Sequence, residues 1–562
     1  MSNITTSYRF HRELESPVAF IRREWKALAV FGGAFVVVLT AAVLAVDPAF
    51  FYPRLSTDPL LYYLKGLAFA ETGHTAARLA VNRPPFHYVA LPGVMRAPFM
   101  MAFKEFDSQL RAIQLSNIVF LVITATMFAF ILSWVVPRRW HWLAIGFTFG
   151  FMLLSPDWVA NVFAPLADAP YAAFSVAFII VATRVLCSER PLRTQPVAIA
   201  AAVALFVLTF LVRFTAPFVL VCVALLAAGR TRHGTIRRKT VALIAGIAAV
   251  GITVLTVLSW ETIKIGYLYI PGLFLLRANK PSIIGNLVAS ALPSQIIPVF
   301  NFGFGGSPVI DPYHVRFGSS PATLLLIALG CAISATIFFG MWRGRNRLTP
   351  ELWYCVVALV VLGPIIPSAA RYLMGYQPFL WIFFYLGMAA LLSPIAASIA
   401  ARRRLLVVGL TAGSLAVAGL VYVRAQRIGG SGADRRVAVS LTGTRRYVNE
   451  VASTFRALRN YLETLPRDRT LLISEPGAYG RWKVISGLDY YRPDSALQMA
   501  VAKRDMYLVT ECGTLEACQD FPAWDALMRL GLVRYGDFSY ELVFSRTTPH
   551  GKARVYRIRN PQ

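Results

Sequence analysis

The chain has 562 residues, of which 57% are hydrophobic and 15% charged, and its mean hydropathy is +0.57. Soluble proteins are roughly 45–50% apolar and about 25% charged, so this composition excludes an ordinary soluble protein. The formal net charge is +28. In a membrane protein, an excess of Lys and Arg is expected in cytoplasmic loops and where the chain contacts anionic lipid head groups or phosphates. We therefore expect a polytopic membrane protein that contacts membrane lipids and has no nucleic-acid partner.

Residues 27–46 form the first uncharged apolar run that can cross a bilayer, since a transmembrane helix needs about 20 apolar residues. The run follows a polar and basic segment, residues 1–26, and is longer than the apolar region of a secretory signal. It predicts an uncleaved anchor with a cytoplasmic N-terminus. In all, about eleven spans are expected in a membrane domain of residues 27–428. The later spans fall at residues 113–136, 141–155, 169–186, 196–212, 216–228, 241–260, 322–341, 352–367, 376–392 and 405–423.

Lys and Arg gather in every second connecting segment, as the positive-inside rule requires of cytoplasmic loops. These clusters are Arg138 and Arg139; Arg184, Arg190 and Arg193; residues 230–239; Arg343, Arg345 and Arg347; and Arg402, Arg403 and Arg404. An odd number of spans places the tail outside. The sequence thus predicts a protein of the cytoplasmic (inner) membrane with an extracytoplasmic C-terminal domain.

Three segments outside the spans are long enough to carry function. Two are outer loops, residues 47–110 and 261–321. The third, residues 429–562, has frequent charges and short apolar runs, which predict a small α/β domain. Its expected elements are a helix at residues 454–465, strands at 469–474 and 506–510, and a hairpin of 540–545 with 553–558.

The cysteines indicate little chemistry. Cys512 and Cys518 enclose a short loop of the outer domain and could form a disulfide or stay reduced. The sequence contains no convincing zinc pattern, nucleotide-binding loop or hydrolase elbow. No cofactor is required by the sequence, and a divalent cation is an option.

Asp58 stands out just after the first span. It precedes Pro59 in the run Ser56-Thr57-Asp58-Pro59, a pattern typical of a helix start, and Gly73 suits the helix end. Asp58 could be only a helix cap, or a carboxylate that accepts a proton from a hydroxyl nucleophile at the outer membrane surface. Asp47, also before a proline, is its rival.

The motifs of this loop resemble those of a known family. Asp58 is followed by Tyr62-Tyr63, then by the segment Arg83-Pro84-Pro85-Phe86-His87-Tyr88, and then by Asp107-Ser108-Gln109-Leu110-Arg111 before a span. This order resembles the GT-C glycosyltransferases, with the closest likeness to the aminoarabinose and protein mannosyl transferase branch and to related lipopolysaccharide sugar transferases. Such enzymes move a sugar from a polyprenyl phosphate to an acceptor outside the cytoplasmic leaflet.

Later segments extend the resemblance over residues 27–392. Asp168 stands before Ala-Pro in an outer loop, Arg213 lies at the outer end of a span, and Arg371 begins an Arg-Tyr-Leu segment. The chain departs from the family where Pro59 replaces a Glu, a change that bears on acceptor handling and metal use. It departs again where Arg83 replaces a Lys, a change that keeps the positive charge and adds a planar fork suited to phosphate.

The resemblance implies a mainly α GT-C helix bundle and a hexosyl or pentosyl transferase. Asp58 would act as base in an inverting single displacement onto a lipid, glycan or protein hydroxyl. Donor phosphate would bind Arg83, Arg213, Arg371 and Lys65. Tyr62, Tyr63, His87 and Tyr88 would line the substrate.

The residues by themselves leave alternatives. Arg213 and Arg371 could mark a site, pair with an acid or extend to the interface. Asp168 could orient the acceptor, pair with an Arg, bind a cation or cap a helix, and Lys65 could belong to a solvated face. The loop aromatics could be interfacial anchors. For the whole chain, a transporter or flippase of lipid-linked sugars and a non-enzymatic envelope assembly protein are the rival functions.

Overall fold

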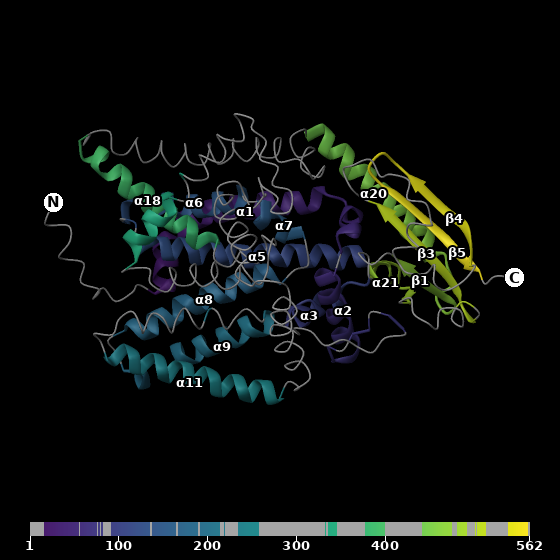
Figure 1. The fold of residues 1–562 in the computed structure, drawn as a ribbon. Helices are drawn as coiled ribbons and strands as arrows, with labels where there is room; N and C mark the ends of the chain where they lie inside the picture. Colours follow the sequence, from purple (N-terminus) through teal and green to yellow (C-terminus); the bar gives the residue numbers. More distant parts are fainter. Residues whose placement is uncertain are drawn as a thin grey trace, which may run out of the picture. The chain divides into compact units, whose positions relative to one another are not determined.

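The computed structural model describes residues 16–55, 57–75, 77, 78, 80, 81, 91–134, 136, 138–154, 156–163, 167–188, 191–213, 219, 234–257, 332, 335–345, 377–398, 441–474, 480–491, 501, 503–512 and 538–559. The chain divides into two compact units. Unit 1 comprises Met1–Val38, Ile118–Val159 and Asp168–Ala425, and unit 2 comprises Leu39–Asn117, Ala160–Ala167 and Gln426–Gln562. The protein is mainly helical, with a small sheet in unit 2 (Figure 1).

Helices occupy the predicted spans wherever the structure describes them. They are α1 (Pro17–Ala45), α5 (Phe106–Ser133), α6 (His141–Leu154), α8 (Asp168–Cys187), α9 (Pro196–Val212), α11 (Gly234–Val257) and α18 (Gln377–Ser398). Short elements join several of them: η2 (Arg138–Trp140), α7 (Pro156–Phe163) and η3 (Leu192–Thr194). The predicted spans at 352–367 and 405–423 and the loop at 261–321 lie outside the described residues, and the spans at 216–228 and 322–341 are described only in part, so the number of spans stays a prediction.

The composition of these helices supports a membrane protein. Among the described residues, three helices are long and apolar enough to cross a bilayer: Pro17–Ala45, Phe106–Ser133 and Asp168–Leu186. α1 begins before the predicted boundary at residue 27, because the basic residues that precede the apolar run continue the same helix. Arg and Lys are good helix formers, so the polar segment adds turns to α1.

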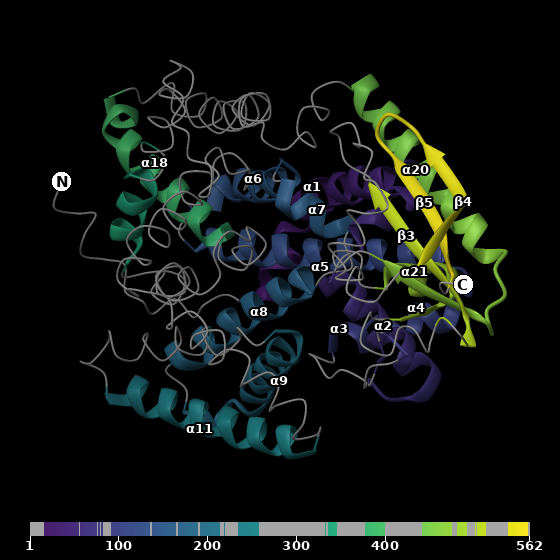
Figure 2. The same cartoon turned by 45° about the vertical axis from the view of Figure 1, so that its right-hand side comes forward.

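Aromatic side chains pack the helices of unit 1. The ring of Phe31 on α1 fits against Gly146 of α6, where a Cβ atom would lie 2.8 Å from it, and Phe35 meets Phe149 one turn further along with ring centroids 5.5 Å apart. Trp381 of α18 contacts Phe151 at 4.4 Å between centroids. The helices α8, α9 and α11 lie side by side (Figures 1 and 2).

Unit 2 combines residues 47–110, the segment that the sequence predicts as the first outer loop and that keeps this name below, with the C-terminal segment. The loop contributes η1 (Pro48–Arg54), α2 (Thr57–Thr72), α3 (Leu91–Val94) and α4 (Ala97–Ala102). The C-terminal segment contributes α20 (Leu441–Glu463), α21 (Arg481–Ser486) and the strands β1 (Thr470–Ser474), β2 (Asp489–Tyr490), β3 (Asp505–Cys512), β4 (Ser539–Thr547) and β5 (Lys552–Arg559). The predicted α/β elements of the tail are therefore confirmed, and the helix is longer than predicted.

The sheet has the order β2-β1-β3-β5-β4. β1 pairs in parallel with β2 and β3, whereas β5 pairs antiparallel with β3 and β4, so the predicted closing hairpin is also confirmed. α20 packs against β4 and β5 (Figure 2). Its buried face includes Phe455, Leu458 and Leu462, which recur at helical spacing and so form one apolar stripe.

One hydrophobic core joins the two parts of unit 2. It contains Tyr52 and Leu55 from the first outer loop, Phe455 from α20, Trp482 from α21 and Val555 from β5. Trp482 stacks against Phe455 with ring centroids 6.2 Å apart and meets Tyr52 edge-on at 6.3 Å. Because this core is shared, the C-terminal segment and the first outer loop form a single packed body.

Candidate functional site

Asp58 lies in the first turn of α2, the second helix of the chain. A carboxylate is favoured there because the helix N-terminus carries a partial positive charge. Its rival Asp47 caps η1, accepting from the backbone N–H of Ala49 at 3.0 Å, and pairs with Arg456 at 2.6 Å. Both carboxylates thus belong to helix starts, and Asp47 is held by a cation and a backbone N–H.

The same face of α2 carries two further predicted site residues. Positions 58, 62 and 65 are separated by four and three residues, which places them on one face of a helix along roughly 10 Å of its axis. Tyr62 and Lys65 are both buried, and only 1% of Lys65 is exposed. The prediction that Lys65 could belong to a solvated face is therefore wrong.

Two glycines let α2 approach α3 closely. A Cβ atom on Gly66 would lie 2.9 Å from the carbonyl oxygen of Gly93, and one on Gly93 would lie 2.6 Å from the Cβ atom of Lys65. Close backbone contact of this kind needs residues without a Cβ atom. The approach buries Lys65 against α3 and brings α4 alongside α2.

Arg96, which precedes α4, is a second buried cation at this place. Only 4% of it is exposed, and its guanidinium lies over the ring of Tyr62 at 5.3 Å from the centroid. Burial lowers the pKa of Lys65 to about 7 and that of Arg96 to about 10. The cluster of Tyr62, Lys65 and Arg96, called here the cation cluster, concentrates positive charge in a desolvated setting, where an anion interacts strongly.

Tyr63 faces the core instead. Its hydroxyl donates to Oε1 of Gln109, whose side-chain amide donates to the carbonyl of Phe103 at 2.6 Å. Its ring packs against Phe106 at 5.2 Å between centroids, and burial raises its pKa. These contacts give Tyr63 a role in fixing α2 against α5.

A polar network beside Tyr63 was not predicted from the sequence. The hydroxyl of Tyr52 donates to Asp107, and Arg459 of α20 donates to that hydroxyl at 2.8 Å and pairs with Asp107 at 3.1 Å. Burial and the neighbouring carboxylate of Asp107 raise the pKa of Tyr52. Asp107 belongs to a motif that the sequence singled out, but nothing in the sequence linked it to Arg459.

Unit 1 holds a second pair of predicted residues. Arg213, immediately after α9, forms an ion pair with Asp168, the first residue of α8, at 2.7 Å. Both are buried, and the guanidinium lies over the ring of Tyr171 at 5.7 Å. Of the alternatives that the sequence left open, pairing of Arg213 with an acid is the one observed.

The other predicted site residues cannot be located in this way. Arg83, His87, Tyr88 and Arg371 lie outside the described residues, and of Asp58 only the backbone position is described. Among the described side chains, no group of three or more His, Cys, Asp or Glu residues could hold a metal ion. The structure brings Tyr62 and Lys65 together with Arg96 in unit 2, and Asp168 together with Arg213 in unit 1.

Comparisons with known proteins give only distant likenesses. No protein-family model matches the chain, and no curated protein matches it. Among solved structures, ArnT from Cupriavidus metallidurans in the apo state is 15% identical with a TM-score of 0.49, covering 94% of this chain and 99% of its own. The archaeal oligosaccharyltransferase AglB from Archaeoglobus fulgidus, in complex with an inhibitory peptide and a dolichol-phosphate, is 10% identical with a TM-score of 0.48, covering 97% and 75%.

ArnT from Cupriavidus metallidurans bound to undecaprenyl phosphate is also similar. It is 14% identical with a TM-score of 0.47, covering 94% of this chain and 99% of its own. At TM-scores below 0.5 these likenesses assign no function, which has to follow from the residues of the chain itself.

Proposed function

We propose that this protein is a membrane glycosyltransferase that moves a hexosyl or pentosyl unit from a polyprenyl-phosphate-linked donor to a hydroxyl of a lipid, glycan or protein. The reaction takes place on the outer side of the cytoplasmic membrane. Such a transfer needs a base for the acceptor proton and cations for the departing phosphate, both within reach of one sugar.

The observation that carries the proposal is the burial of Lys65 on α2, the helix whose first turn contains Asp58. Taking a cation out of water is costly, and ionisable groups whose pKa values are shifted by burial cluster at functional sites. Arg96 adds a second buried cation from the neighbouring α4. One face of α2 therefore carries a position for a carboxylate together with the part of the cation cluster that α2 contributes, and this cluster suits an anion.

The chemistry follows from these groups. Asp58 accepts the proton of the acceptor hydroxyl while the oxygen of that hydroxyl forms a bond to the anomeric carbon. The bond from that carbon to the phosphate oxygen breaks in the same step, so the configuration inverts and the polyprenyl phosphate leaves with the bonding electrons. Lys65 and Arg96 bind the phosphate as its charge grows, a stabilisation that acts most strongly where water is excluded. A positioned base typically contributes about 10²- to 10⁴-fold.

Arg83, Arg213 and Arg371 are proposed as further phosphate-binding residues. In this proposal Asp168 orients the guanidinium of Arg213 through the 2.7 Å ion pair. Tyr62, His87 and Tyr88 would contact the sugar or the lipid chain.

The test begins with the product. Mass spectrometry of envelope lipids and glycans from cells with and without the chain identifies the transferred sugar as a missing unit. The purified Asp58→Asn variant should then lose transfer of that sugar by at least about 10²-fold while it still retains the polyprenyl-phosphate donor.

Glu71→Gln is the matched control, because it makes the same chemical change at the exposed far end of α2. It should transfer sugar normally. Full activity of Asp58→Asn would refute the proposed base. An unchanged envelope profile would favour a non-enzymatic assembly protein, and movement of a lipid-linked sugar without bond cleavage would favour a flippase.

A further inference from the structure

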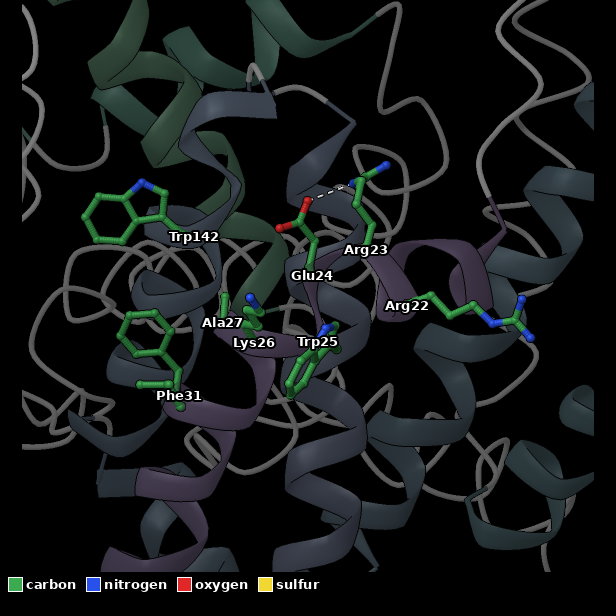
Figure 3. A pocket seen from close by; sticks show the side chains of 9 residues that line it. Arg22, Arg23, Glu24, Trp25, Lys26, Ala27, Phe31 and Trp142 are labelled. Atoms are coloured by element: carbon green, nitrogen blue, oxygen red, sulfur yellow. Dashed lines mark hydrogen bonds and ion pairs between the residues drawn. The ribbon is translucent and has the colours of Figure 1, made fainter.

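A groove in unit 1 lies beside the charged end of α1. It has a volume of about 600 Å³ and is lined by residues 22–27, Val30 and Phe31 of α1 and by Trp142 of α6. In Figure 3, Trp142 and Phe31 lie on one side, Arg22 lies on the other, and Trp25 and Lys26 lie between them. The packing of Phe31 against Gly146 fixes the two helices that form its walls.

The lining carries three cations and one carboxylate: Arg22, Arg23, Lys26 and Glu24. The carboxylate is already engaged, since Oε1 of Glu24 lies 2.9 Å from Nδ1 of His141 and 2.8 Å from Nε of Arg23. This contact offsets the charge of Arg23. The positive charges of Arg22 and Lys26 are left to attract an anion.

The groove also lies at the end of an apolar, exposed helix face. Lys26, Val30 and Val37 follow one another at helical spacing, and Val30 and Val37 are 66% and 67% exposed. Exposed valines on a helix long enough to span a bilayer are typical of a surface that faces lipid chains. The cations therefore stand where this lipid-facing surface ends.

Two exposed tryptophans mark the same level. Trp25 is 58% exposed and Trp142 is 47% exposed, and they belong to different helices that both line the groove. Tryptophan is enriched at the level of lipid head groups, because its ring is apolar and its N–H is polar. Cations, tryptophans and an apolar helix face thus follow one another in the order in which a phospholipid presents its phosphate, glycerol and acyl chains.

We infer that this groove binds the phosphate of an anionic phospholipid, with Arg22 and Lys26 contacting the phosphate and the acyl chains lying along Val30 and Val37. The site is distinct from the proposed transfer site and does not depend on that function. A basic residue near a membrane surface strengthens binding of anionic lipid by about fivefold.

The test is a lipid titration of the full-length protein followed by native mass spectrometry. The protein is purified in a neutral detergent and titrated with phosphatidylglycerol or with phosphatidylcholine of the same chain length. The native protein should retain phosphatidylglycerol in preference to phosphatidylcholine, and R22Q/K26Q should lose roughly 25-fold in phosphatidylglycerol affinity. R22K/K26R should keep it, because both charges remain.

Arg193→Gln removes a cation from the exposed η3 helix and should have no effect. Equal retention of the two lipids by the native protein would overturn the inference, as would unchanged phosphatidylglycerol binding by R22Q/K26Q. A further titration adds inorganic phosphate as a competitor of phosphatidylglycerol. If it displaces phosphatidylglycerol at equal concentration, the groove is a site for free phosphate and the lipid assignment is wrong.

Discussion

The hydroxyl of Tyr52 donates a hydrogen bond to Oδ1 of Asp107 at 2.5 Å, although 55 residues separate them in the chain. Arg459 of α20 contacts both groups. Burial alone would lower the pKa of Arg459, but hydrogen bonds with Glu463 and Tyr52 and the charge of Asp107 raise it. The C-terminal segment thus supplies a cation that holds the first outer loop to the start of α5.

Removal of this hydroxyl should weaken unit 2. Tyr52→Phe leaves the ring in the core but deprives Asp107 and Arg459 of a partner, so we expect a loss of about 1–3 kcal/mol in the free energy of unfolding. Chemical denaturation of the full chain in detergent measures this loss in the free energy of unfolding. In a double-mutant cycle with Arg459→Met, the two losses should not add, because the groups share one network. Additive losses would contradict the coupling.

The ion pair of Asp168 and Arg213 should be costly to break from one side only. Arg213→Met leaves a buried carboxylate without its cation, for which a loss of about 3–5 kcal/mol in the free energy of unfolding is typical. The double variant D168L/R213M removes both charges and should recover much of that loss. Denaturation in detergent compares the three proteins. A double variant less stable than Arg213→Met would show that the pair is not an isolated electrostatic unit.

In the proposed donor site, Lys65 should give phosphate binding a pH dependence. Its folded pKa is about 7 against an ordinary value of 10.5, so above about pH 7 an increasing fraction is neutral and binds phosphate less well. The affinity for a polyprenyl phosphate should therefore fall as pH rises from 6 to 9, by at most about tenfold per unit. Lys65→Met should bind weakly throughout and lose this dependence, whereas Lys104→Met, at an exposed position, should keep it.

The same lysine also links stability to pH. Between pH 7 and 10.5 the unfolded chain carries the Lys65 proton more often than the folded chain, so the contribution of this group to the free energy of unfolding rises with pH across that window. Lys65→Met should flatten this rise. A rise of the same slope in both proteins, measured by denaturation at several pH values, would show that Lys65 is protonated in the folded state.

The glycine contact between α2 and α3 offers a steric test. A Cβ atom on Gly93 would lie 2.6 Å from the Cβ atom of Lys65 and 3.0 Å from the backbone nitrogen of Gly66. Gly93→Ala should therefore force the helices apart and cost about 1–3 kcal/mol in unfolding free energy. It should also weaken binding of a polyprenyl phosphate, because the cation cluster depends on that approach.

Gly150→Ala is the control for this substitution. Gly150 lies within α6, and nothing stands within 4 Å of an added Cβ atom. Alanine should leave the protein as stable or raise the free energy of unfolding by up to about 1 kcal/mol, since it favours a helix over glycine. If Gly93→Ala behaved in the same way, the close approach of α2 and α3 would not be important for the fold.

The sequence by itself determined the features that depend on neighbouring residues. Residues 196–212 are predicted as a span and form α9 with the same bounds, because length and apolarity are properties of one continuous segment. The strand at Thr470–Ser474 follows from a short apolar run, and the hairpin of β4 with β5 follows from two such runs joined by a turn. Asp58 at the start of a helix likewise needed only the following proline and the spacing beyond it.

Tertiary structure alone decided which charges are buried and which segments meet. Nothing in the residues around Arg96 predicts its burial, yet packing of α4 against α2 buries it over Tyr62. Nothing near Tyr52 predicts that Arg459, 407 residues later, donates to its hydroxyl. Burial and charge pairing depend on contacts between distant segments, and a local pattern carries no information about the partner that it will meet.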